Sequence, residues 1–354
     1  MLQEYRSLPI LIFYLSLASA LAGHACLTIH KRYQTCKSNV QWQSKHSHKL
    51  VLFILLACAS LASTWYYMFA FFAHSYRSWR GQCTLAQLHE LERASLPMKG
   101  ELWLRDTKLF KQAWETVSET PERHWWSGQI FLFTVAWSIF LGVMGRRFNI
   151  PRVWMYMLLG QVVAISFAQS LFAATVVVSF PRQSQSTRRQ SATASRSGDD
   201  SRGNGTLWVP PALLELGPVL ISLLSAAVVP LVAHTSYFMP VLLIPHLLLF
   251  VPGVLSPGML PRGWGKSQPV AVAARRYARV FHWLFAILVV LVAQSTYALT
   301  ATAEGTLWRR LLSAMSEHAA VSSVSWDVVC CFLVVVSWTA AHSGDVQEML
   351  DAYD

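Results

Sequence analysis

The chain has 354 residues, of which 54% are hydrophobic and only 13% are charged, whereas an ordinary soluble domain has roughly 25% charged residues. Its formal net charge is +11, and the basic residues lie mostly between apolar stretches, which favours anionic lipid headgroups over nucleic acid as their partner. This composition excludes an ordinary soluble protein. It predicts an all-α integral membrane protein, a helical bundle that crosses the bilayer several times.

Eight stretches come close to the about 20 apolar residues that a helix needs to cross the hydrocarbon core. They cover residues 8–29, 50–73, 129–144, 153–180, 213–233, 237–251, 280–301 and 321–341. The first stretch could instead be a signal peptide, because Ala18, Ala20 and Ala22 form a small-residue cleavage pattern. Its apolar run is long for a signal peptide, which favours a retained span. We therefore expect a single domain with about eight transmembrane helices.

The connection between the second and third stretches, residues 74–128, is too long to be a plain linker. Thr84 and Gln87 form a capping-box pattern, which predicts a short helix that ends before Pro97. A second helix should follow, with one apolar face made of Leu109, Phe110, Ala113, Trp114 and Val117. We expect this second helix to lie in the membrane interface or to fold over the spans as a lid.

Residues 181–208 are rich in Ser, Arg, Gly and Thr without periodicity, which predicts a disordered loop. A glycosylation sequon at residues 204–206 is usable only if this loop faces the lumen. In the fifth and sixth stretches, Pro230, Pro240 and Pro245 permit kinks and a cavity between helices.

The orientation in the membrane is left open by the sequence. With eight crossings, the side that holds the N-terminus carries 19 Lys and Arg residues and the other side carries 10, which favours a cytosolic N-terminus by the positive-inside rule. The flanks of the first span, with one basic residue before it and five after it, favour the reverse.

Three carboxyl groups are candidate proton donors: Glu215 at the start of the fifth span, Asp327 within the eighth, and Asp106 in the charged segment before the third. A charge at the centre of a span costs on the order of 2.5–3.5 kcal/mol, so an ionisable residue there is a functional candidate. A carboxyl partly removed from water stays protonated near neutral pH and can act as a general acid. With eight crossings, Glu215 would share the N-terminal face with Asp106 and His74, while Asp327 would enter from the other face.

Each of these acids also has a structural interpretation. Asp106 could be a helix N-cap, Glu215 could extend to water, and Asp327 could bond a neighbouring helix. Further candidates, for substrate binding, are Trp103, Trp114, Trp125, Trp126, Gln161 and His282. An indole face stabilises positive charge, although Trp and His near span ends are commonly interfacial anchors. Gln161 could equally join two helices.

Motifs for metal-dependent ionisation of a diphosphate, for nucleotide binding and for di-iron chemistry are absent from the sequence. The six cysteines show no spacing typical of a zinc site or of a disulfide framework. We therefore expect neither a metal nor a cofactor.

Residues 101–172 contain the runs DTxLFxxAWxxV, RxWWSxQxxLFTVAW and VWxYMLLGQxVAISFAxxLF. In these runs the chain resembles the fungal membrane-bound terpene cyclases of the ascochlorin, ascofuranone and macrophorin type. The resemblance implies a multi-pass enzyme of secondary metabolism, expected in the endoplasmic reticulum, that acts on a farnesylated aromatic or quinol-like meroterpenoid. Such an enzyme protonates an epoxide or an alkene and directs a carbocation cascade without a metal or a redox cofactor. The alternative is a non-enzymatic transporter or sensor that uses the same polar residues to bind a small apolar molecule.

Overall fold

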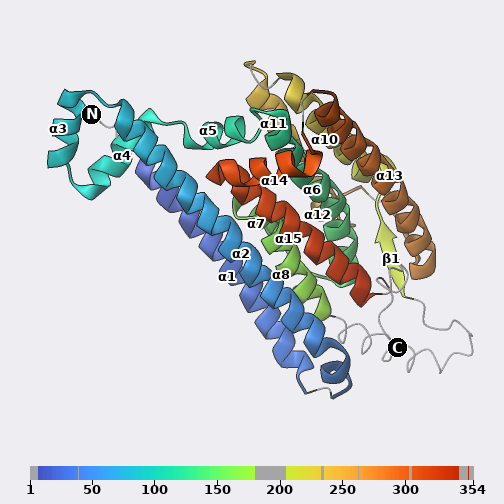
Figure 1. Ribbon diagram of the computed structural model, residues 1–354. Helices are drawn as coiled ribbons and strands as arrows, with labels where there is room; N and C mark the ends of the chain where they lie inside the picture. The colour runs from blue at the N-terminus through green and yellow to red at the C-terminus, as the bar shows by residue number, and fades with distance from the viewer. Residues whose placement is uncertain are drawn as a thin grey trace, which may run out of the picture.

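The chain folds into a bundle of tilted helices, shown as a computed structural model in Figure 1. The structure describes residues 7–38, 40–179, 205–232, 235–261, 263–302, 305–342 and 350. Within these residues, six helices are long and apolar enough to cross a membrane. They are α1 (Ser7–Cys36), α2 (Val40–Gln82), α6 (Pro121–Arg147), α10 (Ala212–Val232), α13 (Val270–Thr302) and α15 (Ala319–Ala341). The prediction of an all-α protein that crosses the membrane several times is confirmed.

Shorter elements complete the fold. They are α3 (Leu85–Arg93), α4 (Leu96–Asp106), α5 (Leu109–Thr116), α7 (Trp154–Val162), α8 (Ile165–Val177), α11 (Phe238–Leu248), α12 (Val251–Val254), α14 (Leu307–Glu317) and the strands β1 (Thr206–Val209) and β2 (Lys266–Pro269). The two strands pair antiparallel, with Thr206 opposite Pro269. The predicted loop 181–208 is therefore wrong at its end, where 206–208 belong to β1; residues 180–204 lie outside the described residues.

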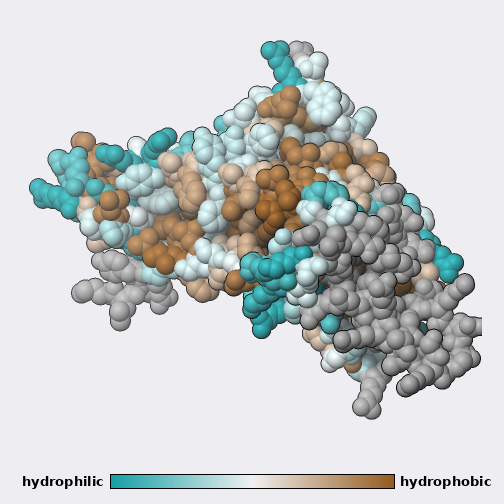
Figure 2. Space-filling model, turned by 90° about the horizontal axis from the view of Figure 1, so that it is seen from below, coloured by the Kyte–Doolittle hydropathy of each residue, from teal (hydrophilic) through white to brown (hydrophobic). Residues whose placement is uncertain are grey.

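The helices run between two faces of the molecule. We call the face where α1 begins, beside α3, α4 and α5, the N-terminal face, and the face at the α1–α2 turn the opposite face (Figure 1). Figure 2, a view from the opposite face, shows extended brown patches of hydrophobic side chains on the surface. Surface of this kind is expected where helices contact lipid, because soluble monomers rarely expose large apolar patches. Exposed residues of this kind include Phe13, Leu231 and Phe285.

The connection 74–128 begins as the sequence predicts. Thr84 and Gln87 form the predicted capping box, and the helix it opens, α3, ends at Arg93 before Pro97. In α5, Leu109, Ala113 and Trp114 pack against the core as expected, followed by the buried Val117. The fifth predicted member of that face, Phe110, is exposed instead.

The fourth predicted span, residues 153–180, is wrong as a single crossing. Its two halves, α7 and α8, lie antiparallel: the ring centroids of Tyr156 and Phe172 are 5.1 Å apart, and the Tyr156 hydroxyl is 2.8 Å from Thr175 Oγ1. Both outer ends lie at the opposite face. There, Val153 packs on Gly145 near the end of α6, and the Val177 carbonyl accepts a hydrogen bond from Trp42 Nε1 near the start of α2. The α7–α8 hairpin is therefore re-entrant, with its tip inside the bundle.

The hairpin reverses the direction of every later helix. Consequently α10 and α13 begin at the opposite face, where Glu215 and Tyr277 meet Arg146 at the end of α6. The helix α15 ends there too, since Lys49 Nζ donates to the Ala341 carbonyl. With the α11–α12 pair taken as one crossing, the described helices cross seven times, and Ser7 and Ala341 lie at opposite faces (Figure 1).

With this topology, the total count of Lys and Arg residues and the charges that flank the first span indicate the same orientation. Counted along seven crossings, the connections at the opposite face carry 18 Lys and Arg residues and those at the N-terminal face carry 11. The total now agrees with the flanks of α1, and the positive-inside rule places the opposite face in the cytosol.

The orientation predicts which sequon can be glycosylated. In a eukaryotic host we expect Asn204 to stay unmodified, because its connection lies at the cytosolic face. Arg93→Asn creates a sequon with Ala94 and Ser95 at the N-terminal face and should add one glycan. The measurement is the mobility shift on gels before and after glycosidase treatment. Modification of Asn204 in the unaltered chain would reverse the orientation.

A close approach of α12 to α6 predicts a second outcome. A Cβ atom at Gly142 would lie 2.3 Å from the Pro252 carbonyl oxygen, which is backbone and cannot rotate away. We expect Gly142→Ala to destabilise the fold by about 1–3 kcal/mol, the usual range for overpacking. In α1, a Cβ atom at Gly23 would have no other atom within 4 Å. Gly23→Ala should therefore leave stability unchanged or raise it. Thermal unfolding in detergent measures the midpoint of each variant. Equal midpoints for Gly142→Ala and Gly23→Ala would contradict the close contact.

Candidate functional site

A cavity of about 150 Å³ lies beside the tip of the α7–α8 hairpin and is lined by residues of α2, α5, α6, α11 and α15. Its wall is mostly apolar, with the rings of Trp114 and Phe131 and the tip residues Val163, Ala164 and Ile165. The polar side chains on the wall are Thr64, Thr134, Gln161, His246, Ser323 and Asp327. A mostly apolar cavity with a few convergent polar groups is the usual form of a small-molecule site.

Asp327 holds the tip of the hairpin. Its side chain is buried, with 7% exposed, and its Oδ2 accepts a 3.0 Å hydrogen bond from the Ile165 N–H. Its Oδ1 accepts from the Ser166 N–H at 2.8 Å and from Ser166 Oγ at 2.5 Å. The first N–H groups of a helix have no partner inside it, and within a bilayer no water replaces them. Asp327 therefore caps α8 from another helix, with its carboxyl group at the positive end of the helix dipole.

His246 lies on the cavity wall in α11. Its Nδ1 is 2.8 Å from the Leu242 carbonyl oxygen, which can only accept, so in the neutral ring Nδ1 carries the proton and Nε2 is the acceptor. Edge-to-face contacts hold the ring, with centroids 5.5 Å from Trp114 and 5.7 Å from Phe131. Gln161 Nε2 donates to the His246 carbonyl at 2.9 Å and so ties the hairpin to α11.

The cavity brings together three of the predicted site residues, Asp327, Trp114 and Gln161. It also contains His246, which the sequence reasoning missed. The signal was available, since His246 is an ionisable residue in the predicted span 237–251, and such residues are functional candidates on the same grounds as the carboxyls.

Glu215 is not at this cavity, and its expected place on the N-terminal face is wrong. It is fully buried at the opposite face, with 0% exposed, where Arg146 Nη2 lies 2.5 Å and Arg276 Nη2 lies 3.5 Å from its oxygens. The Tyr277 hydroxyl lies within hydrogen-bond distance of both Glu215 oxygens, at 3.0 Å from Oε1 and 3.1 Å from Oε2. Through these contacts Glu215 joins α6, α10 and α13, and it does not line the cavity.

Asp106 is neither an N-cap nor a buried acid. It is the last residue of α4, its side chain is exposed, and it accepts hydrogen bonds from Trp79 Nε1 at 3.2 Å and Arg105 Nε at 3.0 Å. Asp106 is therefore a surface residue and does not line the cavity.

The remaining predicted residues have structural partners away from the cavity. Trp103 Nε1 donates to Ser75 Oγ at 3.3 Å, Trp125 Nε1 to Thr296 Oγ1 at 3.0 Å, and Trp126 Nε1 to the Leu311 carbonyl at 3.0 Å. These bonds hold α4, α13 and α14 against α2 and α6. The exposed His282 contacts only the Ala278 carbonyl of its own helix among the described residues, at 2.6 Å.

No family model, curated protein or solved structure matches this chain. The cavity is therefore the structural observation that bears on function. Within the described residues, no group of three or more His, Cys, Asp or Glu side chains could hold a metal ion.

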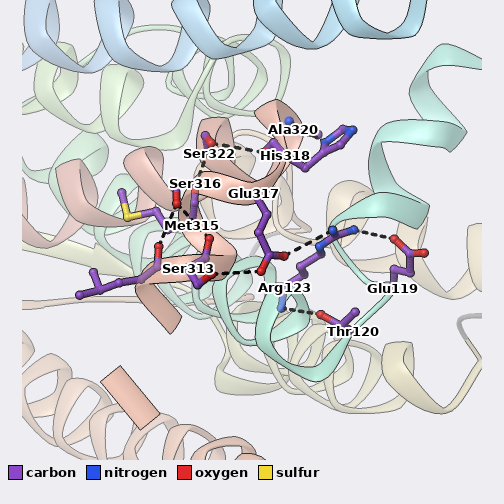
Figure 3. Close-up of polar contacts among 11 residues, drawn as sticks. Glu119, Thr120, Arg123, Ser313, Met315, Ser316, Glu317, His318, Ala320 and Ser322 are labelled. Carbon is purple, nitrogen blue, oxygen red and sulfur yellow. Dashed lines mark hydrogen bonds and ion pairs between the residues drawn. The ribbon is translucent and has the colours of Figure 1, made fainter. Parts of the chain in front are cut away.

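The corner between α14 and α15 is joined to α6 by polar contacts (Figure 3). Arg123 of α6 bridges Glu119 at 2.6 Å and Glu317 at 3.5 Å, and His318 Nδ1 accepts a 3.2 Å hydrogen bond from the Ala320 N–H, capping α15. The His318 ring also contacts His74, with centroids 4.9 Å apart. An accepting Nδ1 is unprotonated, so the cap requires the neutral ring in its Nε2–H tautomer.

This cap predicts a pH dependence of stability. Desolvation lowers the pKa of His318, and the nearby His74 and Arg123 lower it further, while Glu119 raises it. Because the folded pKa lies below the unfolded value of about 6.5, the stabilisation is complete above that pH and is lost as the pH falls below it. We expect the unfolding midpoint of the protein to fall between pH 7.5 and 5.5. His318→Asn keeps a capping side chain that does not titrate and should reduce this fall; an unchanged pH dependence would contradict the assignment.

Proposed function

We propose that this protein is an integral membrane terpene cyclase that binds a prenylated aromatic molecule and starts its cyclisation by proton donation from Asp327. The observation that carries the proposal is that, of the three predicted acids, only Asp327 lines the cavity at the hairpin tip. Residues 101–172, which resemble terpene cyclases, supply more than half of the lining, including Trp114, Phe131 and Gln161. On the same resemblance we propose the endoplasmic reticulum as its location.

The proposed reaction is an isomerisation. Protonated Asp327 donates its proton to the epoxide oxygen of the substrate, a C–O bond breaks, and the hydroxyl and a carbocation form. Alkene electron pairs of the prenyl chain then close the rings, and the final cation loses a proton to a base. His246 Nε2 is a neutral acceptor on the same wall. A plain alkene would be protonated at carbon with the same overall balance, so substrate and product have equal mass.

The environment of Asp327 suits this role in two ways. The two N–H groups and the hydroxyl that point at it stabilise the carboxylate that remains after the proton leaves, and they are in place before the reaction begins. The rings of Trp114 and Phe131 can stabilise a nearby carbocation, and the mostly apolar wall disfavours the water that would capture it.

Substrate binding requires the cavity to enlarge. Its volume of about 150 Å³ is below the roughly 300–1,000 Å³ of sites for drug-sized ligands. The short helix α5, which carries Trp114 and spans the N-terminal face between α4 and α11 (Figure 1), has no fully buried residue. Elements with few buried contacts open most easily, so we assign α5 the role of the lid.

One observation favours a second candidate, a transporter or sensor for a small apolar molecule. Helices that break within the membrane and turn their free ends toward a central cavity are typical of ligand sites in secondary transporters. In that case Asp327 and the start of α8 would hold a ligand without transferring a proton to it.

The test feeds a farnesylated phenol and its epoxide to microsomes that contain the protein, and mass spectrometry then searches for an isomer of unchanged mass. We expect the isomer from the unaltered protein and a loss of about 10²–10⁴-fold with Asp327→Asn, the usual contribution of a general acid. Asn keeps one oxygen to cap α8, and expression is checked for each variant. Asp106→Asn, at an exposed residue remote from the cavity, is the matched control and should keep full activity.

The outcomes separate the two candidates. Full activity of Asp327→Asn would remove Asp327 as the donor. No isomer from the unaltered protein with any of several such substrates would place the transporter or sensor ahead of the cyclase.

A further inference from the structure

A groove of about 590 Å³ lies at the opposite face, between the β1–β2 ribbon and the first turns of α10 and α13. Its apolar wall includes Pro211 and Leu213, and its polar side chains are Lys266, Gln268 and Arg276. It is separate from the cavity at the hairpin tip, and nothing in the proposed cyclase reaction uses it.

Among the described residues, the positive charge of the groove is only partly paired. The carboxylate that pairs with Arg276 is Glu215, and that group already has Arg146 at 2.5 Å. Arg276 Nη2 is shared between the Pro210 carbonyl at 3.2 Å and Glu215 at 3.5 Å, and the guanidinium also lies over the Tyr277 ring. Lys266 is exposed and has no ion-pair partner among the described residues. Two cations therefore face the groove, with room for an anion.

The groove also lies where phospholipid headgroups lie. Leu213, on its wall, is 81% exposed, and further along α13 both Trp283 and Phe285 are exposed and are expected to contact lipid chains. Trp264, on the groove wall, is 52% exposed, and Trp is enriched at the level where headgroups meet the hydrocarbon. The groove thus combines exposed apolar side chains with two cations.

The orientation of the protein indicates which leaflet the groove faces. The opposite face is the one with 18 of the Lys and Arg residues, and the positive-inside rule places it in the cytosol, where the leaflet is rich in anionic lipids. We infer that this groove binds one anionic phospholipid of the cytosolic leaflet, with its headgroup between Lys266 and Arg276 and an acyl chain along Leu213.

The experiment measures lipid binding by the full-length purified protein in detergent. The probes are phosphatidylserine and phosphatidylcholine with identical chains, and native mass spectrometry counts the lipids retained. We expect stronger binding of phosphatidylserine, and a loss of about fivefold with Lys266→Gln, the effect of one basic residue near a charged surface. Arg276 is left unchanged, because its contact with Glu215 would confound the result.

Lys31→Gln is the matched control, since Lys31 is an exposed lysine at the same face but outside the groove. Equal weakening by both variants, or equal affinity for the two lipids, would overturn the site. A third arm adds millimolar inorganic phosphate: displacement of the lipid by phosphate alone would show a soluble anion site and overturn the lipid assignment. Because these readouts involve no catalysis, their failure leaves the cyclase proposal untouched.

Discussion

The hydrogen bonds from the start of α8 to Asp327 are the interaction on which the architecture depends. A helix that begins inside the bundle exposes N–H groups that neither water nor its own backbone can satisfy. Because α15 supplies a carboxylate at that level, the chain can turn at Val163 and Ala164 and return to the face from which it came. The cavity beside the tip, the odd number of crossings and the orientation all follow from this turn.

Glu215 and Asp327 are both buried carboxyl groups, but the side chains around them differ, and these neighbours indicate different roles. Glu215 faces two guanidinium groups and a phenol, so its charge is matched and it joins three helices. Asp327 faces only neutral donors and a helix dipole, beside a cavity with aromatic rings. Residue type and depth made both carboxyl groups candidates for proton donation, with Glu215 preferred, and only the partners distinguish a structural ion pair from a carboxyl group surrounded by neutral donors.

Local patterns predicted local structure well. The capping box at Thr84, the end of α3 before Pro97 and most of the apolar face of α5 could be found because their determinants lie within a few residues. The break at Val163 could not, since no Gly or Pro marks it and its stabilising partner is 162 positions away. The same limit applies to Glu215, whose Arg146 partner lies on another helix. Counting the hairpin as a full crossing then inverted every assignment of faces that followed. Asp327 was found because burial of an acid in an apolar span is itself a local signal.

The complete burial of α8 has a consequence for biosynthesis. Each of its 13 residues is buried, and the carboxyl group that caps it lies 162 positions further along the chain. While the chain is being made, the N–H groups at the start of α8 therefore lack this partner until α15 has been synthesised. A chain truncated before α15 would leave these groups unpaired inside the bilayer, where no water replaces the missing carboxyl.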